Sequence, residues 1–390
     1  MRNSRDENLR ENRKKAAKDY KKAVRNSARN AQREIASQLR ALKTKDPKAY
    51  WNIINRSKHA RTTIPHCSDF FNLFNNMGGE NEGVNSNCAG DEDPTVLLNN
   101  PYLDQLITDG EVTTALNNLK NGKACGLDLI INEFLKKSKE QMLPIFTKLF
   151  NIVLVTGFVP NDWTIGLICP IFKNKGNPSD VNNYRGITIL SCFGKLFTAV
   201  IDNRLTAFLE DSNILGKEQA GFRKKYSTLD HLFTLHGIID ILLSKKKRLY
   251  CAFLDYEKAF DKIERAFLWQ KLINENIGGR VLNVIRNMYA AAKSCVVSNK
   301  ECSDFFTSNI GVRQGENLSP VLFSLFLNDM KGFLEDQISG LGTVSEEAYK
   351  CGMNEDNVNE LMKLFVLLYA DDTVIFSETS DSLQTGLTKI

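Results

Sequence analysis

Three carboxylates stand at the ends of apolar, strand-like runs. One run ends in Asp255, and a second, Leu364–Tyr369, leads through Ala370 to the adjacent pair Asp371 and Asp372. A further apolar run follows the pair, which predicts a hairpin with residues 370–372 at its tip. Adjacent carboxylates repel each other, and a hard divalent cation such as Mg²⁺ relieves that repulsion. Taken alone, Asp255 is better explained as a helix cap, and Asp is also a common turn residue. The apolar flanks of the pair favour a turn that emerges from a core.

A third segment joins a loop to a helix. The loop contains Arg313, Gln314 and Gly315, and Ser319-Pro320 follows at the head of an apolar run. Ser before Pro predicts the N-cap and first turn of a helix. Gly315 would let a ligand approach the backbone closely, because glycine has no side chain. Alone, this segment indicates only a well-marked helix start.

Charge is distributed unevenly along the chain. The net charge is +5, but residues 1–61 hold 19 Lys and Arg against 6 Asp and Glu, so this segment carries +13 and the remainder −8. A dense cationic segment indicates either contact with a polyanion such as nucleic acid or a solvated helix face. The nine cysteines form no CxxC pair, which argues against zinc and favours reduced thiols. No signal peptide and no membrane-length apolar run is seen, so an intracellular protein, nuclear or cytoplasmic, without membrane contact is expected.

Periodicity divides the chain into four segments. Residues 1–62 form a basic helical region, in which 9–42 predicts one long amphipathic helix. Residues 63–107 are a partly disordered linker, because 76–101 is rich in Asn, Gly and Glu and lacks periodicity. Order resumes at Thr108, which has capping-box spacing to Glu111. Beyond it, predicted strands (165–172 and 249–254) alternate with predicted helices (229–243 and 256–272), which indicates an α+β fold.

The three chemical segments together resemble motifs A, B and C of the palm of reverse transcriptases from non-LTR retrotransposons. Their order matches: an aspartate strand, an Arg-Gln-Gly loop with its helix, and a Tyr-Ala-Asp-Asp hairpin. The resemblance extends upstream over about residues 108–390. Residues 124–136 resemble the N-terminal extension of these enzymes, 170–187 their fingers, and 219–230 the segment before the palm.

This resemblance implies the fingers and palm of a right-hand polymerase, with a ferredoxin-like palm sheet packed on helices. Residues 108–251 would form the N-terminal extension and fingers, and 252–390 a palm that is cut before the thumb. The basic region before them resembles the linker that joins an endonuclease to the polymerase. A chain without a thumb is expected to support little processive synthesis.

The implied activity is RNA-directed DNA polymerisation by two-metal nucleotidyl transfer, with an RNA template, a DNA primer and deoxynucleoside triphosphates. Asp255, Asp371 and Asp372 would hold two Mg²⁺ ions, or Mn²⁺, and the carbonyl of Tyr256 would complete one coordination sphere. The other implied contacts are to the nucleotide: Lys173 and Arg185 to the triphosphate, and Gln314 and Gly315 along the nucleotide and template.

Phe260, five residues after Asp255, matches the aromatic ring that excludes a 2′-hydroxyl in this family. One alternative is an RNA-dependent RNA polymerase, in which a second Asp shortly after the first accepts a hydrogen bond from that hydroxyl. Asp261 lies where such a residue is expected, but Phe260, the Tyr-Ala-Asp-Asp turn and the Arg-Gln-Gly loop favour reverse transcription. The other alternative is a non-catalytic remnant that binds nucleic acid.

Overall fold

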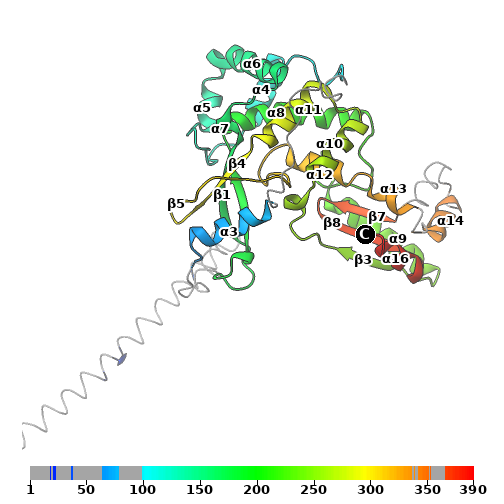
Figure 1. Ribbon diagram of the computed structural model, residues 1–390. Helices are drawn as coiled ribbons and strands as arrows, with labels where there is room; N and C mark the ends of the chain where they lie inside the picture. The colour runs from blue at the N-terminus through cyan, green and yellow to red at the C-terminus, as the bar shows by residue number, and fades with distance from the viewer. Residues whose placement is uncertain are drawn as a thin grey trace, which may run out of the picture. The chain divides into compact units, whose positions relative to one another are not determined.

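The computed structural model describes residues 64–78, 99–335, 338, 341–350, 352 and 365–390, together with 18, 21, 22 and 37 (Figure 1). The predicted basic helix therefore lies outside the described residues, apart from Lys18, Lys21, Lys22 and Ser37, which are helical and exposed. The chain divides into two units, Met1–Ile64 and Pro65–Ile390, and the site lies in the second.

One large apolar core joins helices from both halves of the second unit. Its helices are α4 (Asp109–Asn118), α5 (Asn132–Lys137), α6 (Lys139–Thr156), α7 (Asn161–Thr164), α8 (Cys192–Asp211), α10 (Arg265–Asn274), α11 (Gly279–Ala290) and α12 (Ser319–Phe326). Helix α8 contributes a fully buried stripe, including Phe197, Ile201 and Leu205, at the four-residue spacing of one helix face. The predicted capping box from Thr108 to Glu111 is confirmed at the start of α4.

The first sheet lies beside this core. Its strands are β1 (Ile165–Phe172), β2 (Tyr184–Ile189), β4 (Lys293–Ser298), β5 (Glu301–Cys302) and β6 (Phe306–Thr307). The order is β2-β1-β4-β5, with β6 also paired to β4. Strands β1 and β2 are antiparallel, whereas β1 and β4 are parallel. Helix α3 (Cys67–Met77) packs on this sheet through Phe70, which is buried against Val296 and Phe306.

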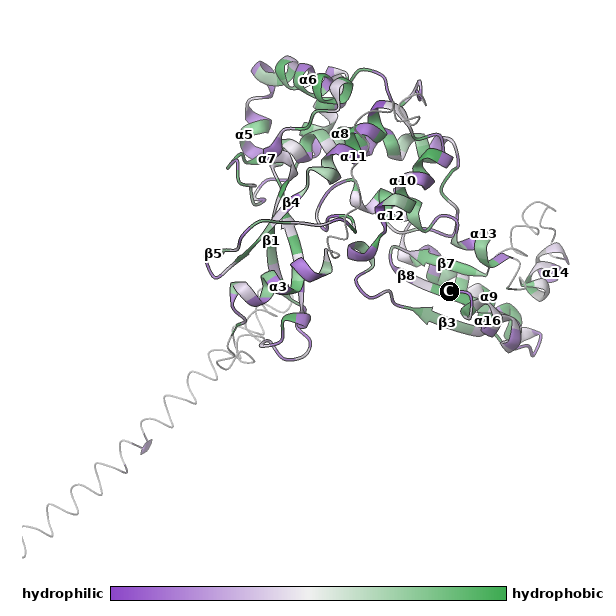
Figure 2. Ribbon diagram, in the orientation of Figure 1, coloured by the Kyte–Doolittle hydropathy of each residue, from purple (hydrophilic) through white to green (hydrophobic). Residues whose placement is uncertain are grey.

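The second sheet has three antiparallel strands in the order β3-β8-β7: β3 (Tyr250–Leu254), β8 (Asp372–Ser377) and β7 (Val366–Tyr369). Hydrophobic residues run along β7 and β8 (Figure 2). Side chains alternate between the two faces of a strand. On one face, Leu368 and Ile375 pack with α13 (Met330–Glu335) and α16 (Ser380–Leu387). On the other face, Leu367 and Phe376 pack with α9 (Thr228–Ser244) and α14 (Gly342–Lys350). None of the described helices has the length and apolar character needed to span a membrane.

The α+β prediction is confirmed, and β1 has the predicted bounds, but the structure differs from the prediction in two segments. Part of the segment predicted as a linker forms the helix α3, because the Phe side chains of α3 pack against the first sheet. The helix predicted over 256–272 is broken: a short 3-10 turn, η3 (Ala259–Lys262), precedes α10. Strands β4–β6, which follow residue 252, belong to the same sheet as β1 and β2, and the division of fingers from palm at residue 252 stays a prediction.

Candidate active site

Strand register brings the first aspartate to the hairpin. Strands β3 and β8 pair Leu254 with Thr373, so Asp255 directly follows the last paired residue of β3, and Asp372 is the neighbour of its partner in β8. Strands β7 and β8 pair Tyr369 with Asp372, which leaves Ala370 and Asp371 as the two turn residues. Asp255 and Asp372 are exposed and Asp371 is half-buried. Residues more than a hundred positions apart in the sequence are thus brought to the same end of the sheet.

The hairpin turn is stabilised by residues 218–221, for which no role in the site was predicted from the sequence. The Leu368 N–H donates to Glu218 C=O, and the Ala220 N–H donates to Leu368 C=O, so residues 218–220 run along the free edge of β7. Gln219 is buried, and its Oε1 accepts hydrogen bonds from the N–H groups of Ala370 (3.1 Å) and Gly221 (2.8 Å). Ala370 has a φ of 60°, an uncommon conformation for a residue with a side chain. The Gln219 amide therefore stabilises the turn that carries Asp371.

Gly221 should be indispensable for this turn. A methyl group on its Cα would overlap the backbone nitrogen of Ala370, and backbone cannot move aside as a flexible side chain can. We expect Gly221→Ala to lower the free energy of unfolding by about 1–3 kcal/mol, as overpacking does. The matched control is Gly237→Ala in α9, where an added Cβ meets nothing within 4 Å. It should stabilise the chain by about 0.5–1 kcal/mol, because Ala favours a helix interior. Urea unfolding measures both; equal effects would contradict this packing.

A hollow of 370 Å³ opens beside the carboxylates, between α9 and the second sheet. Asp255, Asp372 and Tyr369 line it from the strands, and His231 and Leu232 line it from α9. Burial lowers the pKa of His231, and its Nε2 has no hydrogen-bond partner. The hollow gives a substrate room next to two of the three aspartates.

The donor chemistry suits a hard cation, since carboxylate oxygens are the ligands that Mg²⁺ prefers. In the described part of the chain, no three His, Cys, Asp or Glu side chains are grouped so that they could hold a metal ion. Tyr256 turns its side chain towards α13, where its hydroxyl lies 3.8 Å from Met330 Sδ. Convergence of the three aspartates on metal, and the use of the Tyr256 carbonyl, stay predictions.

The two predicted phosphate-binding cations lie together on the first sheet. Register pairs Ile171 with Arg185, and Lys173 lies two residues beyond Ile171, so alternation sets both cations on one face. Arg185 is exposed, while Lys173 Nζ donates to the carbonyl of Asn182 at 3.1 Å. Lys173 also lies close enough to lower the pKa of Asp261, so it faces the segment that follows the first aspartate.

The Phe260 ring is held by two other aromatic residues. It stacks on Phe323 of α12, with ring centroids 4.5 Å apart and an angle of 13° between the planes. It also meets Phe222 edge-on at 6.1 Å. Phe222 follows Gly221, whose backbone lies against Ala370, so this contact connects Phe260 to the hairpin turn. A half-buried ring with this support has little freedom to swing aside.

Gln314 and Gly315 join the loop before α12 to the first sheet. The Gln314 carbonyl accepts a hydrogen bond of 3.0 Å from the N–H of Thr188 in β2. Gly315 has a φ of 106°, and a Cβ there would lie 2.7 Å from the Thr188 carbonyl oxygen. The close approach that Gly315 permits is therefore to a strand of the protein. The predicted N-cap at Ser319 is also wrong, because Leu318 is the N-cap and the Ser319 hydroxyl donates to the carbonyl of Arg313.

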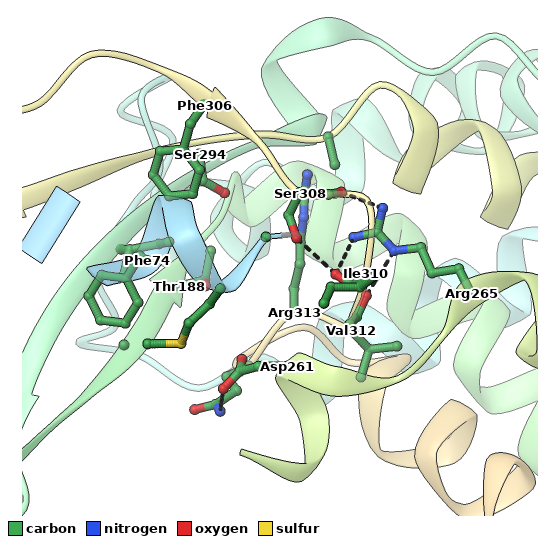
Figure 3. Close-up of a pocket in the computed structure, with 17 residues that line it drawn as sticks. Phe74, Thr188, Asp261, Arg265, Ser294, Phe306, Ser308, Ile310, Val312 and Arg313 are labelled. Carbon is green, nitrogen blue, oxygen red and sulfur yellow. Dashed lines mark hydrogen bonds between the residues drawn. The ribbon is translucent and has the colours of Figure 1, made fainter. Parts of the chain in front are cut away.

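Arg265 at the start of α10 fixes the loop that leads to Gln314. Its guanidinium donates to the carbonyls of Ser308, Ile310 and Gly311, at 2.6 to 3.1 Å (Figure 3). Burial lowers the pKa of Arg265 to about 10, which still leaves it charged at neutral pH. Arg265 was not predicted from the sequence, because nothing local in the sequence distinguishes an arginine that binds a loop from a surface one.

Comparison with known proteins agrees with this architecture. Residues 172–390, more than half of the chain, match the family model for reverse transcriptase (RNA-dependent DNA polymerase). The chain therefore belongs to the reverse transcriptase family.

Its relatives include polymerases of mobile elements. The chain is 28% identical over 268 residues to the RNA-directed DNA polymerase from mobile element jockey of Drosophila funebris, which covers 69% of this chain and 29% of that protein. It is 28% identical over 223 residues to the probable RNA-directed DNA polymerase from transposon X-element of Drosophila melanogaster (56% and 24% covered). It is 26% identical over 242 residues to the Pol polyprotein from retrotransposable element R2 of Nasonia vitripennis (62% and 22% covered).

The chain thus spans less than a third of the length of each of these relatives. Their names confirm the predicted resemblance to enzymes of non-LTR retrotransposons. Among solved structures, it is similar to apo telomerase from Candida tropicalis truncated from its C-terminal domain, with a TM-score of 0.38 and 15% identity over 62% of this chain and 51% of that one.

Proposed function

We propose that this chain carries the nucleotidyl-transfer centre of an RNA-directed DNA polymerase, which extends a DNA primer on an RNA template. The observation that supports the proposal is the strand register, which pairs Leu254 with Thr373 and Tyr369 with Asp372, so that the residues following these strands, including the three aspartates, lie at one end of the sheet. Family membership supports the reaction class, and the adjoining hollow supports access for a primer end.

Each part of the site has a role in this proposal. Asp255, Asp371 and Asp372 would hold two Mg²⁺ ions, with the Tyr256 carbonyl as a further ligand. When bound, such ions activate the attacking 3′-hydroxyl and stabilise charge on the leaving pyrophosphate. The protein supplies the positioning that phosphoryl transfer depends on. Lys173 and Arg185, on one face of the first sheet, would bind the triphosphate through charge-assisted hydrogen bonds.

The remaining residues would shape the nucleotide site. The supported Phe260 ring would lie against the sugar and exclude a 2′-hydroxyl. Gln314 and Gly315 would lie along the nucleotide and template, on a loop held by Thr188 and Arg265. The RNA template, DNA primer and deoxynucleoside triphosphates are thus the proposed substrates.

Single-nucleotide incorporation tests the proposal without requiring processive synthesis. The purified chain is given a DNA primer on an RNA template, one complementary deoxynucleotide and Mg²⁺. We expect extension by one nucleotide, its loss when EDTA removes the metal, and recovery when Mg²⁺ is restored in excess. Extension that persists in EDTA, or no extension under any condition, would contradict the proposal.

The basic segment predicts a steep salt dependence of binding. Each phosphate that is neutralised releases counterions, so log affinity should fall against log salt by about 0.7–0.9 per contact. We expect a slope of several units for the whole chain on primed RNA. Replacing the exposed lysines Lys18, Lys21 and Lys22 by Gln should reduce the slope by about 2.

The matched control replaces three exposed lysines elsewhere in the chain, Lys137, Lys148 and Lys389. Titration of fluorescent primed RNA at several salt concentrations gives each slope. A control that loses as much slope as the first triple variant would show that the basic segment is only a solvated face.

A further inference from the structure

The segment after the first aspartate is tied to the loop that carries Gln314. The Gly311 N–H donates to the Ile263 carbonyl (2.7 Å), and the Val312 N–H donates to the Phe260 carbonyl (2.8 Å). A Cβ on Gly311 would lie 2.6 Å from the Asp261 carbonyl oxygen, so the two backbones are in close contact. These bonds also explain the break in the predicted helix, because the carbonyls of Phe260 and Ile263 are used by the loop.

One side chain adds to these backbone bonds. Gln314 Nε2 donates to Asp261 Oδ2 at 3.1 Å. Asp261 lines a cavity of 90 Å³ between α3, the first sheet and the loop, together with Arg265 and Arg313 (Figure 3). The Asp261 carboxyl therefore points towards the protein interior and is already bonded to a neighbour. This differs from the role that an RNA polymerase would require of it, in which the same carboxyl accepts a hydrogen bond from a sugar.

The bond decides which way the Gln314 amide faces. An ionised carboxylate has only acceptors, whereas an amide group has a donor end and an acceptor end. The Gln314 NH₂ must therefore face Asp261, and its carbonyl oxygen Oε1 must face away. A protonated Asp261 could donate instead, and the amide could then turn its NH₂ outward. The charge of Asp261 thus decides whether Gln314 presents its Oε1 or its NH₂ outward.

We propose that Asp261 is a positioning residue, which holds the Gln314 amide with its Oε1 outward as an acceptor for a hydroxyl or amino group of the incoming nucleotide or template. This inference rests on the proposed function, because it is the nucleotide site that gives Gln314 a ligand. It goes beyond that function by giving Asp261 a task that neither sugar selection by the Phe260 ring nor the metal site requires.

The charge of Asp261 responds to pH near neutrality. Burial raises the pKa of Asp261 to about 6, against the lowering effects of Lys258 on the same turn and Lys173 of the first sheet. Arg265 and Arg313 line the same cavity, but Arg265 donates to backbone carbonyls and Arg313 to the carbonyl of Thr164. Asp261 is thus ionised at pH 8 and protonated at pH 5, so the amide should be held only at the higher pH.

The first test measures stability and needs no activity. Urea midpoints of wild type, Asp261→Ala, Gln314→Ala and the double variant form a cycle at pH 8. We expect non-additive losses, because the second substitution removes a bond that is already broken. Asp261→Asn gives a second readout. Because the pKa of Asp261 is raised in the folded state, the free energy of unfolding of wild type should fall as pH rises from about 4 to 6. Asp261→Asn lacks this titration, so its stability relative to wild type should increase over this range. Additive losses, or a pH-independent difference, would overturn the bond.

The second test measures single-nucleotide incorporation between pH 5 and 8.5. Wild type should lose nucleotide affinity as pH falls through about 6, seen as a rise in KM of about tenfold with a smaller change in kcat. Asp261→Asn should have a raised KM already at pH 8, and its KM should not rise further as the pH falls through about 6. Asp162→Asn, an exposed carboxylate of α7, should keep the wild-type profile.

Three results separate the hypotheses. If the KM of Asp261→Asn rises at low pH as it does in wild type, the positioning role is overturned. A second result would be that Asp261→Asn keeps that rise in KM and changes the preference for deoxynucleotides over ribonucleotides. That result would overturn the positioning role in favour of direct contact between Asp261 and the sugar. An inactive wild type would count against the proposed function, whereas the stability cycle would still decide whether Asp261 holds Gln314.

Discussion

Asp371→Asn is expected to reduce nucleotide incorporation by at least about a thousandfold, because one neutral amide replaces a carboxylate that would neutralise metal charge. Asp255→Asn and Asp372→Asn should have effects of similar size, since the register sets both at the same end of the sheet. The substitution is nearly isosteric, so the urea midpoint should change little. Pre-steady-state incorporation of one nucleotide at saturating Mg²⁺ measures the rates.

The control for this prediction is Asp162→Asn, which removes the same charge at an exposed position in α7. It should incorporate nucleotide at the wild-type rate. A residual rate within tenfold of wild type in any of the three variants would exclude that aspartate from the metal site. A large fall in stability would instead show that the carboxylate supports the hairpin.

Phe260→Val is expected to relax discrimination against ribonucleotides by roughly a hundredfold, the scale at which a pocket rejects a single added group by shape. The structure adds a reason for a large effect, because the ring is stacked on Phe323 and cannot turn away from a 2′-hydroxyl. The measured quantity is the ratio of kcat/KM for a deoxynucleotide and the matching ribonucleotide. Deoxynucleotide incorporation should change much less than ribonucleotide incorporation.

Loss of the ring also removes packing from the core, so the effect on selectivity needs a separate control. Phe333→Val makes the same substitution at an exposed position of α13. It should leave the ratio unchanged. If Phe260→Val also leaves the ratio unchanged, the ring does not select the sugar, and the RNA polymerase alternative regains support.

Several features followed from the sequence because local chemistry determines them. The apolar run of β1, the capping box at Thr108 and the two strands around Asp371 each depend on residues close together in the chain. The order of the three motifs was enough to predict the family, which the match over residues 172–390 confirms. The assignment of the dNTP contacts remains a prediction, because it depends on groups that meet only through a bound substrate.

Tertiary structure decided what local patterns cannot encode. The apolar face of α3 is recognisable, but only the presence of β4 and β6 makes burial of Phe70 favourable. The break before α10 arises because Gly311 and Val312 take hydrogen bonds that a continuous helix would have used. The Gln219 amide is an ordinary polar side chain until the fold buries it against Ala370.

The same distinction applies within the site. The sequence by itself determined that three aspartates end strand-like runs, and that an aromatic residue and an Arg-Gln-Gly loop accompany them. Only the tertiary structure brought Asp255 to the end of the sheet where Asp372 lies, and only it directed the Asp261 carboxyl towards Gln314. The physical reason is that residue type and spacing specify which bonds a side chain can make, whereas strand register and backbone packing select the partner among many that are chemically equivalent.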